Sequence, residues 1–388
     1  MRLLLGVILL FNLGAVEGIS QDQSAESRIV RLGQSAAFSG PASELGKKMR
    51  LGIEAALTES VLVGGIGGKQ VFLTYLDDGY EPGRTVANIR TLIDEKTVFA
   101  LLGAVGTPTS RAAAPIARDS GVPFIAPFTG AALLRDTEGF PNVVNFRASY
   151  QQETDEMVDR LVKERGFTRF GLLYQDDSFG RAGLHALQAA TARYGLKLVG
   201  SGIYERNTVA VKTAVLDLMR AEPEAVVIFG AYRPAAAAIT WSHELGFKPV
   251  FVNISFVGSQ DLARELRPGI SDVFVTQVVP DYMSEEFEIA RQFRSALEAV
   301  WPGSKPDYIS FEGYVGARML LAAMQNCADT LTRECVLDRF KSKEPMELGG
   351  MVLNFGPDDN QGSDAVFLTE FDGAGQFSQV ASFTDGRH

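Results

Sequence analysis

Apolar runs that suit buried strands alternate along this chain with segments of helical period. The runs form two successive sets, 29–34, 71–76, 100–102, 124–126 and 143–146, and then 170–174, 198–202, 225–229, 250–253 and 273–277. Between them, apolar residues recur with helical spacing in segments such as 45–57, 85–95, 110–119 and 152–165. This strand–helix–strand alternation predicts parallel sheets covered by helices on both faces. The near-continuous apolar character of the strands agrees with burial on both sides.

The two sets of strands predict two copies of one architecture. A chain of 388 residues exceeds one ordinary domain and accommodates two. No repeat with a period of about 20–50 residues appears, which argues against a solenoid. Near the C-terminus, the short apolar runs 351–355 and 365–371 flank the turn-rich segment 356–360, Gly-Pro-Asp-Asp-Asn. We therefore expect two α/β lobes followed by a strand-rich tail.

The first twenty residues differ from the rest of the chain. Arg2 supplies a short positive start and Leu3–Leu10 is almost entirely apolar. This stretch is too short for a membrane anchor and fits a secretory signal peptide over residues 1–20, cleaved near Gly18 to Ser20. A buried N-terminal strand or helix is the alternative. No cysteine lies near the cleavage region, so we expect an exported, periplasmic protein without a lipid anchor.

The net charge bears on which partners the protein can bind, and the cysteines bear on whether it forms a disulfide. The formal net charge of -10 argues against nucleic acid, because phosphate neutralisation needs clustered Lys and Arg. In an oxidising compartment, Cys327 and Cys335 are placed to form a local disulfide; two unpaired, buried thiols are the alternative. The three histidines, His185, His243 and His388, are far apart in the sequence and do not suggest a metal site.

Enzyme signatures do not occur in the sequence. There is no G-x-S-x-G elbow, no phosphate-binding loop ending in Gly-Lys-Ser/Thr and no G-x-G-x-x-G after a strand. The glycine-rich segment 64–70 lacks a hydroxyl after Lys69 and suits a turn before a strand. Asp77-Asp78 and Asp176-Asp177 stand at strand ends, but neighbouring residues point in different directions, so neither pair alone predicts an acid/base dyad. We therefore predict a protein that is not an enzyme and that uses no cofactor.

Two segments that follow strands carry the chemistry of a binding site, because ligands of open α/β sheets bind where strands end. In the segment 103–110, Thr107 suits a helix N-cap and Pro108 the first helical position. A helix starting there aims free amides, its positive dipole end and several hydroxyls at one point, which suits a carboxylate. In the segment 126–131, Thr129 and Gly130 offer a hydroxyl and an amide beside Phe128. The alternatives are a plain capped helix and a structural turn.

Taken in order, these segments resemble the type I periplasmic solute-binding proteins of the branched-chain amino acid (leucine/isoleucine/valine) class, which serve ATP-binding-cassette (ABC) importers. The resemblance runs from about residue 28 to residue 377. It rests on the order and spacing of short motifs: Ser39-Gly40-Pro41 with Leu45-Gly46, Asp77-Asp78-Gly79, 103–110, 123–130, 145–150, 174–180, Gly230-Ala231-Tyr232 and 251–258.

The resemblance implies an α/β fold of two doubly wound, Rossmann-like lobes joined by three crossing strands. The crossings are expected near Asn142–Arg147, Val275–Pro280 and Gly349–Leu353. Lobe one is then residues 27–145 plus 280–349, and lobe two is residues 146–279 plus 350–385.

The resemblance also implies a ligand cleft between the lobes. In lobe one, the turns 106–110 and 128–130 match positions that hold the carboxylate and ammonium of an amino acid in similar proteins. Lobe two and the first crossing are expected to add mainly aromatic side chains. The predicted ligand-binding residues are Gly106, Thr107, Thr109, Phe128, Thr129, Gly130, Tyr150, Phe179, Tyr232, Ser255 and Phe256. A strand-end aromatic residue that belongs to the core is the alternative for each ring.

One departure from the family pattern bears on the ligand. Amino-acid binders commonly carry Glu or Asp after the strand that matches 250–252, where it pairs with the ligand ammonium. This chain reads Asn253-Ile254-Ser255-Phe256 instead, which leaves Asp78 or Asp177 to compensate. A buried ammonium without a counter-charge costs several kcal/mol. We therefore expect a ligand with an apolar or aromatic body and a carboxylate or amide.

The function that follows is ligand capture by hinge closure, read by a membrane partner. We expect a monomer that binds a small molecule, with no nucleic-acid partner, and that delivers it to the membrane permease of an ABC importer. A ligand-sensing module for a membrane receptor or kinase is the first alternative, because both roles use exposed lobe surfaces. An exported hydrolase is the second, and it requires a reacting constellation in the cleft.

Overall fold

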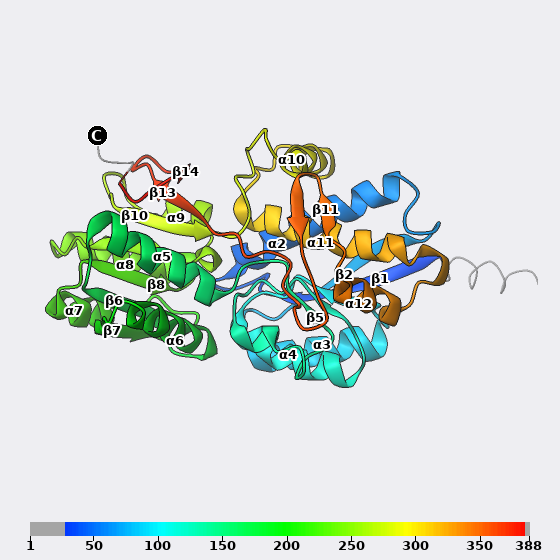
Figure 1. Ribbon diagram of the computed structural model, residues 1–388, viewed down its shortest axis with the longest axis horizontal. Helices are drawn as coiled ribbons and strands as arrows, with labels where there is room; N and C mark the ends of the chain where they lie inside the picture. Colours follow the sequence, from blue (N-terminus) through cyan, green and yellow to red (C-terminus); the bar gives the residue numbers. More distant parts are fainter. Residues whose placement is uncertain (1–27, 385–388) are drawn as a thin grey trace, which may run out of the picture.

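The computed structural model describes residues 28–384, and the expected signal peptide lies outside the described residues. Two large sheets each form the centre of one lobe, and two further strands form a separate hairpin (Figure 1). We call the lobe built on the five-stranded sheet lobe one and that built on the seven-stranded sheet lobe two. Each strand expected from the first two sets of apolar runs is present. The prediction of an α/β fold with two parallel-sheet lobes is thus confirmed.

Lobe one is a parallel sheet with the strand order β2-β1-β3-β4-β5. Helices α2, α10 and α11 pack together on one face, and α3 and α4 pack together on the other (Figure 1). The element bounds are β1 Ile29–Ala36, α2 Ser43–Leu62, β2 Gln70–Asp77, α3 Pro82–Arg90, η1 Thr91–Glu95, β3 Ala100–Leu102, α4 Thr107–Asp119, β4 Phe124–Ile125, η2 Ala132–Arg135, β5 Val143–Val144, α10 Glu288–Val300, α11 Tyr308–Asn326, η4 Ala328–Thr330 and α12 Arg333–Lys341.

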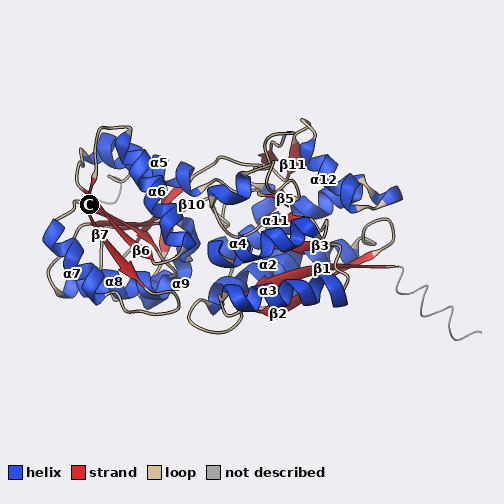
Figure 2. Ribbon diagram, turned by 90° about the horizontal axis from the view of Figure 1, so that it is seen from below, coloured by secondary structure: helices blue, strands red, loops and turns tan. Residues whose placement is uncertain are grey.

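Lobe two has the strand order β14-β13-β10-β9-β8-β6-β7, in which β13 runs antiparallel to both of its neighbours and the other pairs are parallel. Its sheet lies between α5 and α6 on one side and α7, α8 and α9 on the other (Figure 2). The bounds are α5 Tyr150–Arg165, β6 Phe170–Gln175, α6 Ser178–Ala192, β7 Leu198–Tyr204, α7 Lys212–Ala221, β8 Ala225–Phe229, α8 Tyr232–Glu244, β9 Val250–Asn253, η3 Ser255–Val257, α9 Ser259–Glu265, β10 Val273–Gln277, β13 Phe367–Phe371 and β14 Phe377–Val380.

Three connections join the lobes: β5 to α5, β10 to α10, and β12 to β13. The first and third run side by side, because the Asn145 amide donates to the Asn360 carbonyl (2.7 Å) and the Gly362 amide to the Asn145 carbonyl (2.9 Å). The third crossing was expected at Gly349–Leu353. Those residues instead form the turn and second strand of a hairpin, β11 Met346–Leu348 and β12 Met351–Leu353, which packs against α11. The paired glycines favour this tight turn, so the chain leaves lobe one only after Leu353.

Helix α5 starts directly after the first connection, and its sequence fixes that start. The Ser149 side chain accepts a hydrogen bond from the Gln152 amide (3.2 Å), and the Gln152 side chain accepts one from the Ser149 amide (2.7 Å). This capping box satisfies two of the donors that a helix start leaves free. It places Tyr150 on the first turn, at the seam between the lobes. The helix ends at Gly166, whose φ of 69° is the left-handed C-cap that glycine favours.

The two cysteines form a disulfide that joins the end of α11 to α12. Cys327 and Cys335 have an S–S distance of 2.01 Å. Within residues 28–384, no helix combines the length and apolar character needed to cross a bilayer.

Candidate functional site between the lobes

The two turns expected to bind ligand lie side by side in lobe one. Strands β3 and β4 are neighbours in the sheet, and the Gly106 amide donates to the Phe128 carbonyl (3.2 Å). The hydroxyl oxygens of Thr107 and Thr129 are therefore only 2.7 Å apart, and both side chains are buried. Gly106 is the N-cap residue of α4, so the first-turn amides of that helix, which lack intrahelical acceptors, face the same region. The arrangement suits an anionic or hydrogen-bonding group of a ligand.

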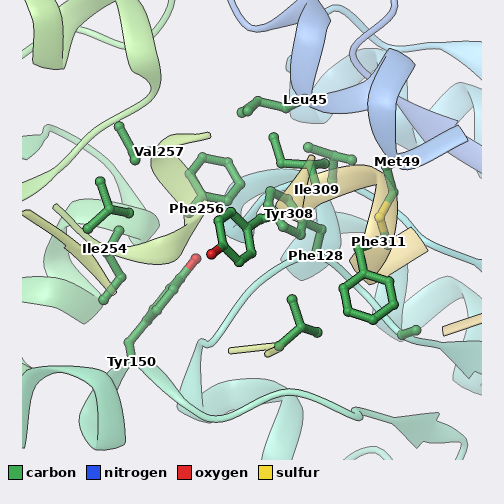
Figure 3. Close-up of a cluster of buried hydrophobic side chains, with 14 of the residues drawn as sticks. Leu45, Met49, Phe128, Tyr150, Ile254, Phe256, Val257, Tyr308, Ile309 and Phe311 are labelled. Carbon is green, nitrogen blue, oxygen red and sulfur yellow. The ribbon is translucent and has the colours of Figure 1, made fainter. Parts of the chain in front are cut away.

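Aromatic rings from both lobes meet beside these hydroxyls. Phe256 of lobe two lies 5.2 Å from Phe128 of lobe one and 4.7 Å from Phe179. Tyr150 stands 5.5 Å from Phe179, and Tyr80 lies 6.0 Å from Phe256. All five rings are buried. Figure 3 shows the Phe256 ring beside Leu45 and Ile309 of lobe one, at the seam. The lobes are thus closed on each other, and the rings form an apolar wall between them.

Tyr150 directs a polar atom into this apolar region. Its hydroxyl is buried and has no hydrogen-bond partner among the described residues. Burial raises the pKa of the Tyr150 phenol, while the charge of Arg147 and the nearby hydroxyls of Thr129 and Thr107 oppose the shift. A Cβ atom at Gly130 would lie 2.5 Å from the Tyr150 ring, so only glycine leaves room for this ring. The phenol therefore adds a third hydroxyl, beside those of Thr107 and Thr129, that a ligand group can engage.

A buried charge network lies at the base of the seam. The Arg147 guanidinium, in the first connection, donates to Glu153 of α5 (3.1 Å) and to Glu312 of α11 (3.2 Å). Glu153 also accepts from the Ser255 amide (2.9 Å) and from the Thr276 hydroxyl (2.5 Å). Arg147, Glu153 and Glu312 are each at most 2% exposed at their side chains. The network therefore ties lobe one, through Glu312, to three elements of lobe two.

Glu312 makes this network sensitive to pH. Burial raises the pKa of Glu312 from 4.5 to about 7; Arg147 opposes the rise and Glu153 adds to it. Because the folded-state pKa is raised, protonated Glu312 favours the folded protein at low pH, and this advantage is lost as the pH rises through about 7. Between pH 5 and pH 7.5, we expect the wild type to lose about 2 kcal/mol of stability relative to Glu312→Gln. Urea unfolding at both pH values measures this difference.

The exposed Glu347 of β11 provides the control for that measurement. The stability of Glu347→Gln should follow the wild type at both pH values. Parallel pH profiles for the wild type and Glu312→Gln would show that Glu312 does not titrate in this range.

Two of the predicted ligand contacts have other partners in the structure, and a third lies apart from the aromatic wall. The Thr109 hydroxyl donates to the carbonyl oxygens of Val105 and Gly106, within its own turn. The Ser255 hydroxyl donates to Glu153 (2.9 Å) and accepts from Arg147, so it belongs to the charge network. Tyr232 starts α8 and is buried, with a hydroxyl that has no hydrogen-bond partner among the described residues, but no described ring of the aromatic wall stacks on it.

The carboxylates that could face a ligand ammonium also have partners. Asp78 accepts from Ser35 (2.8 Å), from the Tyr80 amide (2.9 Å) and from Thr85 (3.1 Å). Asp177 accepts from Gln175 (2.6 Å), from the Phe179 amide (2.9 Å) and from Arg206 (3.0 Å). Both are therefore engaged with the protein itself in the closed form.

A narrow cavity of about 10 Å³ remains at the mouth of the seam. Residues of both lobes line it: Pro41, Ala42, Tyr80, Gln175, Asn207, Thr208, Ala231 and Pro234. Cavities that hold small organic ligands generally have volumes of about 300–1,000 Å³. A ligand must therefore enter by separating the lobes.

Several residues of this region were not identified from the sequence. Tyr80 has a positive φ of 64° and its hydroxyl accepts from Gln175 of lobe two (3.4 Å). Arg147 and Glu312 pair across 165 positions of sequence. A motif signal existed only for Arg147, within the segment 145–150, and nothing in the sequence marked Glu312 as its partner.

Comparison with known proteins agrees with this architecture. The periplasmic binding protein family matches residues 29–376. The Leu/Ile/Val-binding protein homolog 7 of Brucella abortus (strain 2308) is 24% identical over 327 residues, which is 80% of each chain. The crystal structure of a possible leucine/isoleucine/valine-binding protein from Rhodopirellula baltica SH 1 is 35% identical, has a TM-score of 0.87 and covers 93% of this chain and 98% of that one.

A substrate-binding periplasmic protein from Ralstonia solanacearum is also similar in structure. It is 26% identical, with a TM-score of 0.83, over 90% of this chain and 100% of that one. The family and fold are those of solute-binding proteins, for which a periplasmic location is implied. The protein belongs to the type I periplasmic binding proteins, in the branched-chain amino acid binding family.

Proposed function

We propose that this protein is the solute-binding component of an ABC importer and that it captures a small organic acid by closure of its lobes. The observation that carries this proposal is the meeting of the Thr107–Thr129 hydroxyl pair with aromatic rings of both lobes. The hydroxyls and the start of α4 suit a carboxylate or amide, and the rings suit an apolar body. Residues 1–20 would be removed on export, so that the mature protein works in the periplasm and delivers its ligand to a membrane permease.

The expected ligand class follows from the carboxylates of the seam. Asp78 and Asp177 each accept three hydrogen bonds from the protein, and Glu153 is paired with Arg147. An ammonium group placed beside the aromatic wall would have to share one of these carboxylates with the donors that it already has. An aliphatic or aromatic carboxylate without an amino group avoids that cost. A branched-chain amino acid is the comparison ligand, because the similar R. baltica protein is described as a possible leucine/isoleucine/valine-binding protein.

A thermal-shift screen of the mature protein tests this function. The panel pairs each amino acid with the carboxylate that lacks its amino group, and adds amides and benzoate. A ligand at about 100 times its Kd stabilises the folded protein by about 2.7 kcal/mol. We expect the simple carboxylates to raise the melting temperature more than their amino-acid counterparts do. A larger shift with the amino acids would show that the ligand is an amino acid and not a simple carboxylate. No shift with any compound would contradict the proposed function.

Two threonine-to-valine variants, one in the proposed site and one outside it, test the location of the site. Thr129→Val removes one hydroxyl of the pair while keeping the side-chain shape, and should weaken binding of the best carboxylate by about tenfold. Thr191→Val is the matched control, because the buried Thr191 hydroxyl bonds only to carbonyls of its own helix, α6. Equal affinities for the two variants would place the ligand elsewhere.

A further inference from the structure

One loop of lobe two makes polar contacts with lobe one at the mouth of the seam. The Arg206 guanidinium, which follows β7, donates to Asp177 of its own lobe (3.0 Å) and to Glu81 of lobe one (2.9 Å). The neighbouring Asn207 amide group donates to the same Glu81 (2.7 Å) and to the Gly79 carbonyl (3.1 Å). Asn207 has a φ of 60°, in the left-handed region that asparagine tolerates better than most residues. The loop thus makes three hydrogen bonds to lobe one.

Arg206 has one partner in its own lobe and one in the other lobe. Asp177 is the N-cap residue of α6 and also accepts from Gln175 (2.6 Å), so the Asp177–Arg206 pair is held within lobe two whatever the position of lobe one. Glu81 is the N-cap residue of α3, in lobe one. Separating the lobes would break only the bonds to Glu81 and Gly79. These bonds therefore exist in the closed form alone.

We propose that Arg206 is a positioning residue for closure: held by Asp177, it captures Glu81 when the cleft shuts and so sets how much of the ligand-free protein is closed. This role rests on the proposed function only in taking closure to be the binding motion. A ligand adds its own contacts to an open–closed equilibrium that Arg206 has already shifted. The larger the fraction of closed protein before binding, the higher the apparent affinity for the ligand.

The exposure of the contact makes this role dependent on salt. The Arg206 side chain is 23% exposed and Glu81 is 44% exposed, so dissolved ions screen their attraction. A second interlobe pair, Lys48 with Asp261 of α9 (2.7 Å), is at most 10% exposed and is screened much less. Added salt should therefore weaken the Arg206–Glu81 contact much more than the buried contacts of the seam.

Distance measurements on the ligand-free protein test the proposal. Spin labels on Arg111→Cys and His185→Cys would stand at exposed positions of α4 and α6, helices that contact each other across the seam. Both native cysteines are in the disulfide, so they do not compete for label. We expect Arg206→Ala to lower the closed-to-open ratio by about fivefold at low salt. In the wild type, that ratio should fall as sodium chloride is raised, and in Arg206→Ala it should depend little on salt.

Variants on both sides of the seam separate closure from local damage. Glu81→Gln, in the other lobe, should lower the closed-to-open ratio as Arg206→Ala does, and the double variant should add little. Arg220→Ala, whose partner Asp217 lies on the same exposed helix of lobe two, should behave as the wild type. An unchanged closed-to-open ratio in Arg206→Ala, or additive effects of the two seam variants, would overturn the proposal. Because no ligand is present, a failed carboxylate screen would contradict the proposed function without touching this result.

Discussion

Replacing Arg147 with methionine should lower the free energy of unfolding by about 3–5 kcal/mol. The side chain is 1% exposed and is the cation that faces both Glu153 and Glu312. Methionine fills much of the same volume but supplies no charge or donor. The two glutamates would then have to hold uncompensated buried charge or take up protons, and each option costs folding free energy. Urea unfolding near neutral pH measures the loss.

The same network provides the internal test of that explanation. If the loss comes from the stranded carboxylates, then Arg147→Met combined with Glu153→Gln and Glu312→Gln should recover most of it. Arg193→Met is the matched control, because Arg193 pairs with Asp155 and Asp159 at a side chain that is 49% exposed. Its effect should be small by comparison, because exposed ion pairs contribute little to stability. A triple variant no more stable than Arg147→Met would show that packing, and not charge, decides the cost.

The fold was predictable from the sequence because its determinants are local. Buried parallel strands must be apolar on both faces, so continuous apolar runs such as 225–229 can be recognised as strands from the sequence. Helical spacing of apolar residues marks the segments between them. The closeness of Thr107 and Thr129 was predictable for a related reason: each follows a strand, and parallel strands end at the same edge of a sheet. The error in the third crossing also has a local cause. Gly349-Gly350 can serve a hinge or a hairpin turn, and the apolar pattern after it suits either lobe.

The seam itself was only partly predictable. Its charge network depends on which distant side chains closure brings together, and the pairing of Arg147 with Glu312 leaves no periodic signal. Arg206 resembles any surface arginine until the structure places Asp177 and Glu81 on either side of it. The family resemblance implied that Ser255 contacts ligand, but its hydroxyl donates to Glu153. Spacing in sequence predicts which residues reach the seam, whereas the partners that engage them there are set by the other lobe.

Gly106→Ala should remove closure and destabilise the fold by about 3 kcal/mol. Gly106 has φ 97° and ψ 153°, a conformation that is open essentially to glycine alone. A Cβ atom at this position would also lie 2.1 Å from Cε2 of Tyr80. Tyr80 cannot move aside easily, because its buried ring packs near Phe256 and its hydroxyl accepts from Gln175. The substitution thus strains the turn before α4 and displaces a ring that both lobes use.

Two further variants distinguish the backbone strain at Gly106 from the clash with the Tyr80 ring. Gly106→Ala combined with Tyr80→Ala removes the clash but keeps the backbone strain, so part of the destabilisation should remain and the lobes should regain the ability to approach. Gly121→Ala is the matched control: its φ is 60°, and an added Cβ would meet nothing within 4 Å. It should cost only about 1 kcal/mol. If thermal unfolding gave Gly106→Ala and Gly121→Ala the same loss, the Tyr80 ring would not be held against Gly106, and the start of α4 would not be coupled to the seam.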